Sequence, residues 1–320
     1  MKKITEIKQY IFISTLLFLF SFSTIIYATD IFPIPQSIKV DKQKASLGKK
    51  LFFDPILSKD KTLSCASCHN LFDNGADKTA YTKGINGMLG YFNVPTVYNA
   101  VYNFRQFWDG RAKDLEEQVL TPIINPVEMG NSIEEVLKDL KNSKYDLLFR
   151  VIYEDGVSKE NLAEVIAEFE KTLTTPNSMF DKYLKDKHFV LSPKIMNGYR
   201  LFKEKGCISC HNGVNVGGNL YNKFGIYEDA NSKELGRFNI TQREEDRYVF
   251  KVPSLRNVEL TAPYMHDGRI KTLEEAINLM SMYQLGRKIP KDELSSMVEF
   301  LKSLTGERPV LEKELDVSND

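Results

Sequence analysis

The stretch that decides the fold is Cys65-Ala66-Ser67-Cys68-His69, which has a second copy in Cys207-Ile208-Ser209-Cys210-His211. Two thiols three positions apart on one helical turn can bond to the two vinyl groups of a haem, and the adjacent histidine can coordinate its iron. The two copies use all 4 cysteines of the chain. The sequence therefore predicts two covalently attached c-type haems, held by Cys65, Cys68, His69, Cys207, Cys210 and His211.

Two other uses of such cysteines compete with haem attachment. A zinc site could take Cys and His ligands, but zinc does not explain why both copies place the histidine at the same offset. A pair of redox disulfides of the thioredoxin type would need a βαβ pattern, which the sequence lacks. The haem interpretation explains both copies and is preferred.

Length and composition predict a folded chain of two units. The chain has 320 residues, of which 42% are hydrophobic, 11% aromatic and 27% charged, and this is ordinary globular composition rather than that of a disordered chain. Basic and acidic residues number 43 each. This balance lacks the basic excess of nucleic-acid-binding proteins, so no nucleic-acid partner is expected.

The first residues have the pattern of an export signal. Lys2, Lys3 and Lys8 precede an uncharged, mostly apolar run from Tyr10 to Ala28. This pattern predicts a cleaved secretory signal peptide over residues 1–28, with an uncleaved membrane anchor as the alternative. In both cases the rest of the chain is exported.

The rest of the chain reads as mainly α-helical. Ser132 and Thr272 each open a capping box that starts an amphipathic run, and Ser158 precedes a third helical pattern. The stretches 74–103 and 212–239 are rich in Gly and Asn and are expected to be ordered loops over haem. The predicted fold class is mainly α, with two cytochrome c-like (class I) haem domains and extensive ordered loops.

A weak internal repeat supports a duplication. The run from Leu47 to Phe52 precedes the first haem motif much as Asn197 to Phe202 precedes the second. With a boundary near Thr175 to Ser178, the predicted domains are 29–178 and 179–305, and the tail 306–320 is a candidate for packing on the first domain.

An iron that only carries electrons needs a second ligand, whereas an iron that binds substrate keeps that position open. His188 lies in a charged run and is expected at the surface, while His266 lies in a turn dense in polar groups. Met280 and Met282 lie in one predicted helix, and spacing alone does not choose among these side chains.

At this point the chain can be compared with a known family by eight ordered motifs. These are Leu57 to Asp60, Ser64 to Asn70, Pro95 to Ala100, Gln106 to Ala112 with Leu115 to Gln118, Asn125 to Met129, Gly206 to His211, Pro253 to Val258, and Thr261 to Gly268. In order and spacing they closely resemble the bacterial di-haem cytochrome c peroxidases over nearly all of the chain that follows residue 28.

The resemblance implies a periplasmic enzyme that reduces hydrogen peroxide to water. Electrons would come from a small cytochrome c or a cupredoxin, enter at the C-terminal haem and pass to a peroxidatic N-terminal haem. The family commonly forms dimers, so a homodimer is expected.

The resemblance also implies roles for single residues, carried over position by position. His69 and His211 match the proximal ligands, and Met280 matches the second ligand of the C-terminal haem. The remaining matches are Gln118 and Glu128 in the peroxide pocket, Trp108 between the haems, and Asn93, Thr261 and Pro263 as ligands of a calcium ion.

One position departs from the family pattern. Many members carry a distal histidine on the peroxidatic haem where this chain has Ile85, which cannot ligate iron. The usual blocked resting state is therefore not expected here, unless Met88 or a tyrosine of the same loop replaces the histidine.

Three other functions compete with a peroxidase. A related di-haem oxidase acting on a protein substrate, as in tryptophan tryptophylquinone maturation, would carry Tyr where this chain has Met280. A plain electron-transfer cytochrome would need neither Gln118 nor Glu128, and a structural or metal-storage protein would need no covalent haem.

Overall fold

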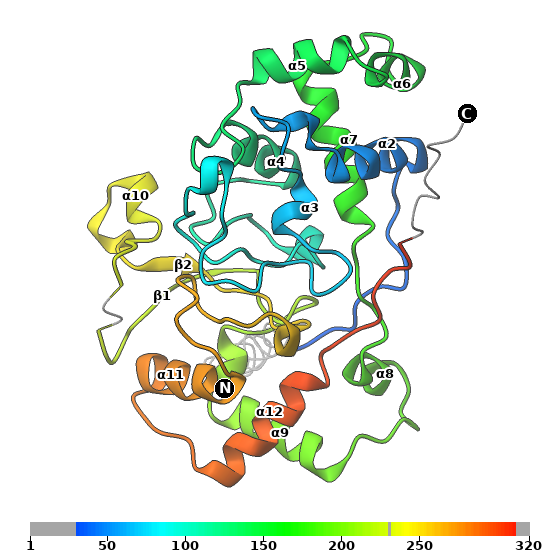
Figure 1. Ribbon diagram of the computed structural model, residues 1–320. Helices are drawn as coiled ribbons and strands as arrows, with labels where there is room; N and C mark the ends of the chain where they lie inside the picture. Colours follow the sequence, from blue (N-terminus) through cyan, green and yellow to red (C-terminus); the bar gives the residue numbers. More distant parts are fainter. Residues whose placement is uncertain (1–29, 230–231, 312–320) are drawn as a thin grey trace, which may run out of the picture.

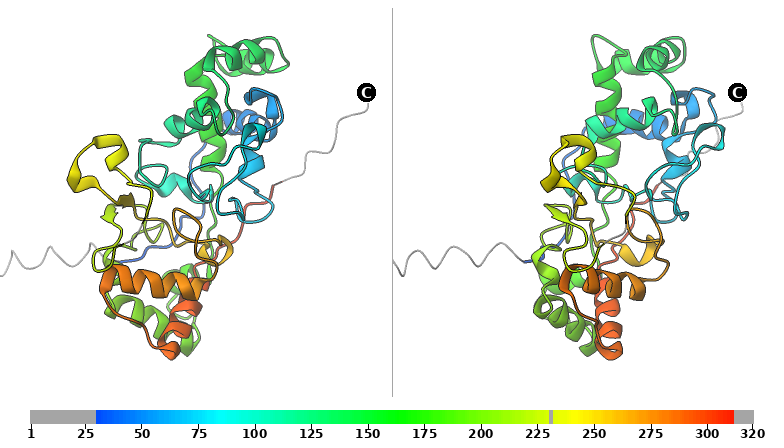
Figure 2. Two further views of the ribbon diagram at one scale, coloured as in Figure 1. Left: turned by 60° about the vertical axis from the view of Figure 1, so that its left-hand side comes forward. Right: turned by 90° about the vertical axis from the view of Figure 1, so that its left-hand side faces the viewer.

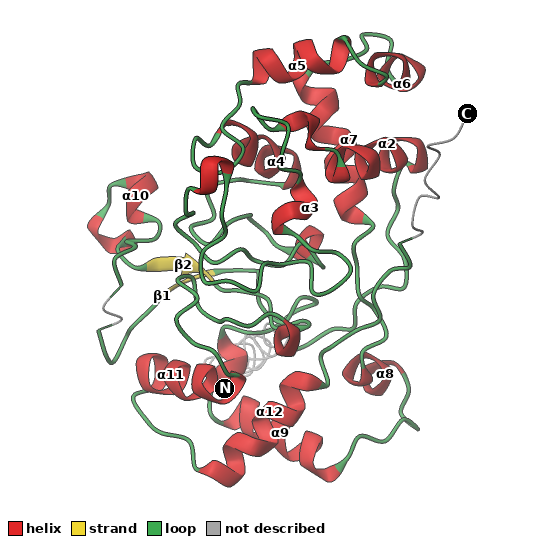
Figure 3. Cartoon of the chain, viewed as in Figure 1, coloured by secondary structure: helices red, strands yellow, loops and turns green. Residues whose placement is uncertain are grey.

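The computed structural model describes residues 30–229 and 232–311, so the predicted signal peptide lies outside the described residues. Figures 1 and 2 show most helices of the first half of the chain at one end of the molecule and most of those of the second half at the other. Long loops and a small sheet fill the space between them, as Figure 3 shows. The prediction of a mainly helical fold is confirmed.

The first half is built around one helix pair. α2 (Lys42–Phe53) and α7 (Lys159–Lys171) pack closely at Gly48. A Cβ added to Gly48 would lie only 1.8 Å from the Val165 carbonyl oxygen, so a larger residue would force the helices apart. Buried Leu51, Phe52 and Phe169 extend this core. The helices of this half are α2 (Lys42–Phe53), α3 (Cys65–Cys68), α4 (Leu115–Ile124), α5 (Ile133–Lys141), α6 (Tyr145–Ile152) and α7 (Lys159–Lys171), with 3-10 turns at Pro55–Leu57, Ile85–Gly87 and Ala100–Tyr102.

The second half repeats this helix pair. α9 (Pro193–Glu204) and α12 (Lys291–Lys302) pack closely at Gly198. A Cβ added to Gly198 would lie only 2.0 Å from the Ser296 carbonyl oxygen. Gly48 and Gly198 hold the same place in the repeat predicted from the sequence. The helices are α8 (Met179–Lys185), α9 (Pro193–Glu204), α10 (Phe238–Thr241), α11 (Leu273–Leu285) and α12 (Lys291–Lys302), with 3-10 turns at Cys207–Ser209, Glu244–Asp246 and Val258–Leu260.

The predicted helix starts are found where the capping patterns placed them. The hydroxyls of Ser132, Ser158 and Thr272 each accept a hydrogen bond from the backbone N–H three residues on, at 3.2 Å in all three cases. The predicted loops also contain a short sheet that the sequence analysis missed. β1 (Tyr221–Lys223) pairs antiparallel with β2 (Val249–Lys251), with Tyr221 opposite Lys251.

A longer internal repeat becomes visible in the structure. The segments 92–118 and 250–276 correspond without a gap at an offset of 158 residues. Each contains a bridge of the same kind, Gln106 with Ala112 and Tyr264 with Ile270, and each then enters a capped helix, α4 or α11. The two halves are therefore related copies well beyond the haem motifs.

The two copies contact each other through reciprocal hydrogen bonds. The N–H of Asn93 donates to the carbonyl of His266, and the N–H of Lys251 donates to the carbonyl of Trp108, both at 2.8 Å. Asn93 corresponds to Lys251, and Trp108 corresponds to His266, at the same offset. The interface between the halves thus has approximate twofold symmetry.

The first and last described segments each pack on the opposite half of the molecule. Ile31, which the sequence analysis assigned to the first domain, instead packs in the core of the second. This correction has a physical cause, because the N–H of Ile34 is bonded to Asp181, whose carboxylate forms a fully buried ion pair with Arg256. At the other end, Leu311 packs against the first core.

Within residues 30–229 and 232–311, no helix is both long enough and apolar enough to cross a membrane.

Candidate haem sites and catalytic pocket

The first haem motif forms a single helical turn. Cys65 and Cys68 are the ends of α3, Ser64 and Ser67 form its capping box, and His69 follows directly. The ring Nδ1 of His69 lies 3.2 Å from the Gly75 carbonyl oxygen. A carbonyl only accepts, so Nδ1 carries the proton and Nε2 is left as the free ligand atom.

The second motif forms a 3-10 turn at Cys207–Ser209, followed by His211. The backbone of Gly217 approaches closely here, since an added Cβ would lie 2.3 Å from the Pro253 carbonyl oxygen and 3.3 Å from His211 Nδ1. That Nδ1 is buried and makes no hydrogen bond of standard geometry with any described residue. Burial lowers the pKa of His211 to about 4, so the imidazole is neutral at pH 7 and suited to metal ligation.

These residues fit covalent haem. The two cysteines of each motif are close in the chain, yet none of the four forms a disulfide. Burial raises the pKa of Cys207 to about 11, and it also raises the pKa of Cys65 and Cys68. Two free thiols beside a buried histidine match the needs of thioether attachment.

Glu128 lies in a turn that folds back on the C-terminal end of α4. The N–H of Met129 donates to the Pro122 carbonyl oxygen at 3.1 Å, and the side-chain amide of Asn125 donates to Glu128 Oε1 at 2.8 Å. Burial raises the pKa of Glu128, an effect partly offset by the charge of Arg111 and the bond from Asn125. A neighbouring loop joins this turn to the first haem motif, because the Ile85 N–H donates to the Glu128 carbonyl oxygen at 2.7 Å and the Thr82 hydroxyl donates to Cys68 Sγ at 3.5 Å.

Ile85 is buried against the Glu128 turn. Its N–H donates to the Glu128 carbonyl oxygen at 2.7 Å, and its Cγ2 would lie 3.2 Å from a Cβ on Gly130. The loop residues that could replace a distal histidine are more exposed, with Tyr81 at 37%, Met88 at 38% and Tyr91 at 62%. An apolar side chain therefore packs against the turn that carries Glu128.

The internal repeat aligns α4 with α11, and the aligned residues differ in whether they can ligate iron. Met280 of α11 corresponds to Pro122 of α4, and proline has no atom that can ligate iron. Met280 packs in an aromatic cluster with Trp108, Phe224 and Phe250. Gln118 is half-buried on α4, one turn before Pro122.

Trp108 lies at the interface between the halves. Its Nε1–H donates to the Asn93 carbonyl oxygen at 2.8 Å, and its ring lies 6.3 Å from that of His266. His266, whose role the sequence left open, is buried, stacks on Phe250 at 4.5 Å and bonds Ser232 Oγ through Nε2 at 2.8 Å. Burial lowers the pKa of His266 to about 4. His188, in contrast, is exposed, as expected.

The predicted calcium ligands come from two segments that are in contact. Asn93 is buried, and its side-chain amide donates to the Thr79 carbonyl oxygen at 3.0 Å, which leaves Oδ1 for another partner. Its backbone bond to His266 holds it against the turn that contains Thr261 and Pro263. Across the described residues, no group of three or more His, Cys, Asp or Glu side chains is arranged to hold a metal ion.

Arg111 and Asn125 are site residues that the sequence analysis did not assign. The guanidinium of Arg111 bonds both carboxylate oxygens of Asp109, at 3.0 and 2.9 Å, and stacks 3.5 Å from the Phe107 ring centre. This pairing fixes a cation near Glu128. The motif from Gln106 to Ala112 carried the signal, but sequence alone did not show that it faces Glu128.

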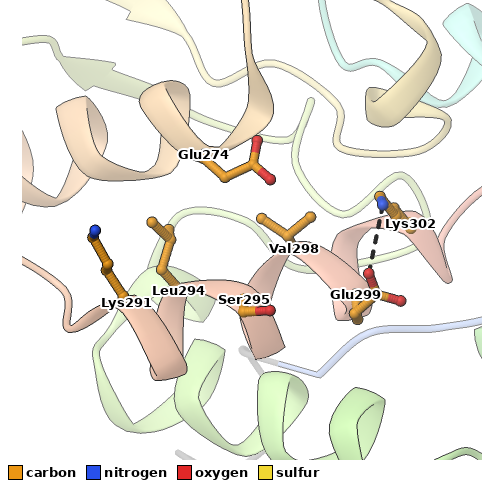
Figure 4. Close-up of a pocket in the computed structure, with 7 residues that line it drawn as sticks. All are labelled: Glu274, Lys291, Leu294, Ser295, Val298, Glu299 and Lys302. Atoms are coloured by element: carbon orange, nitrogen blue, oxygen red, sulfur yellow. Dashed lines mark hydrogen bonds and ion pairs between the residues drawn. The ribbon is translucent and has the colours of Figure 1, made fainter.

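A surface groove between α11 and α12 contains none of the predicted site residues. It is lined by Glu274, Lys291, Leu294, Ser295, Val298, Glu299 and Lys302, as Figure 4 shows.

Comparison with known proteins gives matches along most of the chain. The family model of di-haem cytochrome c peroxidase matches residues 42–188, and that of cytochrome c matches residues 195–305. A cytochrome c551 peroxidase of Nitrosomonas europaea is 46% identical over 87% of this chain and 84% of its own length. The cytochrome c peroxidase Ccp of Escherichia coli K12 is 44% identical over 86% of this chain, which spans 60% of that longer protein.

The fold also matches a solved structure. A MauG-like protein associated with microbial copper homeostasis is 26% identical, with a TM-score of 0.75, covering 89% of this chain and 96% of the other. This agreement confirms the predicted class of two cytochrome c-like domains.

Proposed function

The chain belongs to the di-haem cytochrome c peroxidase family, and we propose that it reduces hydrogen peroxide to water at the haem attached to Cys65 and Cys68. The observation that carries this proposal is Glu128, a half-buried carboxyl with a raised pKa, whose turn is bonded to the loop that contacts Cys68 of the first haem motif. Its counterpart helix in the second half offers Met280, whereas α4 offers Pro122. One haem site therefore has a thioether available, and the other has an acid-base group instead.

The chemistry needs two protons and two electrons for each peroxide, and it gives two molecules of water. The haem, when bound, supplies the iron that holds the peroxide and the route for the electrons. Glu128 takes the proton from the oxygen nearer the iron and returns it to the departing oxygen, which leaves as water. The bond from Asn125 holds the carboxylate in place, and the backbone bond from Ile85 holds the turn that carries it.

Gln118 has the role of orienting peroxide or water in this proposal. It lies on α4, as does Pro122. The carbonyl oxygen of Pro122 accepts the Met129 N–H, and this bond holds the Glu128 turn. As a neutral amide it can donate and accept hydrogen bonds without competing for the proton.

Electrons would enter at the second haem, whose iron His211 and Met280 would hold. A thioether ligand raises the reduction potential, which suits an entry site. The packing of Met280 in the cluster that includes Trp108 supports this assignment over Met282, which is not part of that cluster. Trp108 then lies on the route between the two halves.

We also propose where the enzyme acts, what donates its electrons and what it binds besides haem. The pattern of residues 1–28 supports export to the periplasm, where a small cytochrome c or cupredoxin would be the donor. The contact between the segments of Asn93 and Pro263 supports a calcium ion at this interface, held by oxygen ligands including Thr261. A homodimer is the expected assembly.

The experiment that tests this function has two steps on the purified holoprotein. A pyridine haemochrome spectrum counts covalent haem, and two per chain are expected. A steady-state assay with hydrogen peroxide and reduced cytochrome c then measures turnover. A protein with two haems and no peroxide turnover would be an electron-transfer cytochrome or an oxidase of another substrate, and the proposal would fail.

A further inference from the structure

Lys251, the last residue of β2, is a buried lysine with no partner among the described residues. The residue is only 7% exposed, and its ammonium makes no ion pair or hydrogen bond with any described residue. Burial lowers the pKa of Lys251 to about 8, and no carboxylate opposes this effect. A charge on a side chain so little exposed is costly unless an anion is near, and the described residues supply no such counter-charge.

The position of Lys251 relates it to the second haem site. Its N–H donates to the Trp108 carbonyl oxygen at 2.8 Å, at the interface between the halves. Two residues further, the Pro253 carbonyl oxygen lies in the close approach to Gly217 and His211. The backbone of Lys251 therefore connects the interface directly to the proximal histidine of the second haem.

The side chain of Lys251 has a defined direction. Phe250 stacks on His266, and alternate residues of a strand point to opposite faces, so Lys251 points away from His266. Its strand partner Tyr221 is bonded to the Gly110 carbonyl oxygen instead, at 3.1 Å. Neither neighbour supplies the missing anion.

The internal repeat shows that this charge is specific to the second half. The residue that corresponds to Lys251 is Asn93, whose amide is neutral and donates to the Thr79 carbonyl oxygen. The backbone bonds of the two residues are the same, so only the side chain differs. The second half thus has a fixed positive charge at a place where the first half has an amide.

We propose that the Lys251 ammonium forms an ion pair with a propionate of the haem attached at Cys207 and Cys210. A haem carries two carboxylates, and the described residues around Lys251 offer none. A cation beside a haem favours its reduced form, which is more negative by one charge, so Lys251 raises the potential of the second haem. The inference rests on haem attachment at this motif and not on peroxide as the substrate.

The test compares the holoproteins of Lys251→Met, Lys251→Arg and the wild type by redox titration of each haem. Lys223→Met is the matched control, because Lys223 is an exposed lysine of the adjacent strand. Lys251→Met is expected to shift the midpoint potential of the second haem downward and to leave the first haem unchanged. Lys251→Arg and Lys223→Met are expected to stay near the wild type.

Three results would overturn the ion pair. The first is an equal potential in Lys251→Met and Lys223→Met, with two haems retained. The second is a shift confined to the first haem. The third is loss of the low-spin signal of the second haem in Lys251→Gln, which would make Lys251 an iron ligand. If Lys251→Met yields no holoprotein, Lys251→Gln removes the charge with a similar chain length and is judged by the same results.

Discussion

Glu128→Gln isolates the proton transfer that the proposed mechanism assigns to this residue. The amide has the shape of the carboxyl, and its oxygen can still accept the bond that Asn125 now donates at 2.8 Å. The turn anchored at Pro122 should therefore keep its geometry, while the group loses its ability to take a proton. Loss of a general acid-base usually costs about 10² to 10⁴ in rate, or roughly 3 to 5 kcal/mol in the barrier.

The assay is steady-state peroxide reduction with reduced cytochrome c as the donor. Turnover of Glu128→Gln should fall within that range, while the haem content and the spectrum of the second haem stay unchanged. Glu134→Gln is the matched control, because Glu134 is an exposed carboxyl on α5, and its turnover should equal that of the wild type. Near-normal turnover of Glu128→Gln would refute the assignment of Glu128 as the acid-base group.

The other predictions concern the same pocket and the two iron ligands. Because Glu128 must be ionised to accept a proton, turnover should fall as pH drops through its raised pKa. Asn125→Ala removes a hydrogen bond that lowers this pKa, so the acid limb of the pH–rate profile should move to higher pH. Met280→Ala should lose the ferric methionine-to-iron charge-transfer band in the near-infrared, and Met282→Ala should keep it. Pro122→Met should place a thioether at the first haem, convert its high-spin signal to low-spin and slow peroxide reduction. Ile85→His should create an activation lag that pre-reduction abolishes, and immediate turnover would count against the proposed effect of this position.

Much of the haem chemistry was predictable because it is encoded in short, local patterns. The spacing of Cys65, Cys68 and His69 fits one helical turn, and α3 has this form. The start of α11 was predictable from Thr272 for the same reason, since a capping box is formed within four residues.

Features that depend on contacts between distant segments could not be predicted in this way. Ile31 belongs to the second core because its segment is held by Asp181, far along the chain. The burial of Lys251 depends on strand pairing and on the bond to Trp108. The correspondence of Pro122 with Met280 was present in the sequence, since the runs Leu115 to Glu117 and Leu273 to Glu275 are identical just before them. The matching bridges made it clear.

The central claim is that the iron of the first haem is open to peroxide while that of the second is closed by Met280. Electron paramagnetic resonance of the oxidised holoprotein, as isolated, tests this most directly. The account predicts one high-spin ferric signal from the haem at His69 and one low-spin signal from the haem at His211. Two low-spin signals, with no high-spin component, would show that some residue closes the first site and would contradict the account.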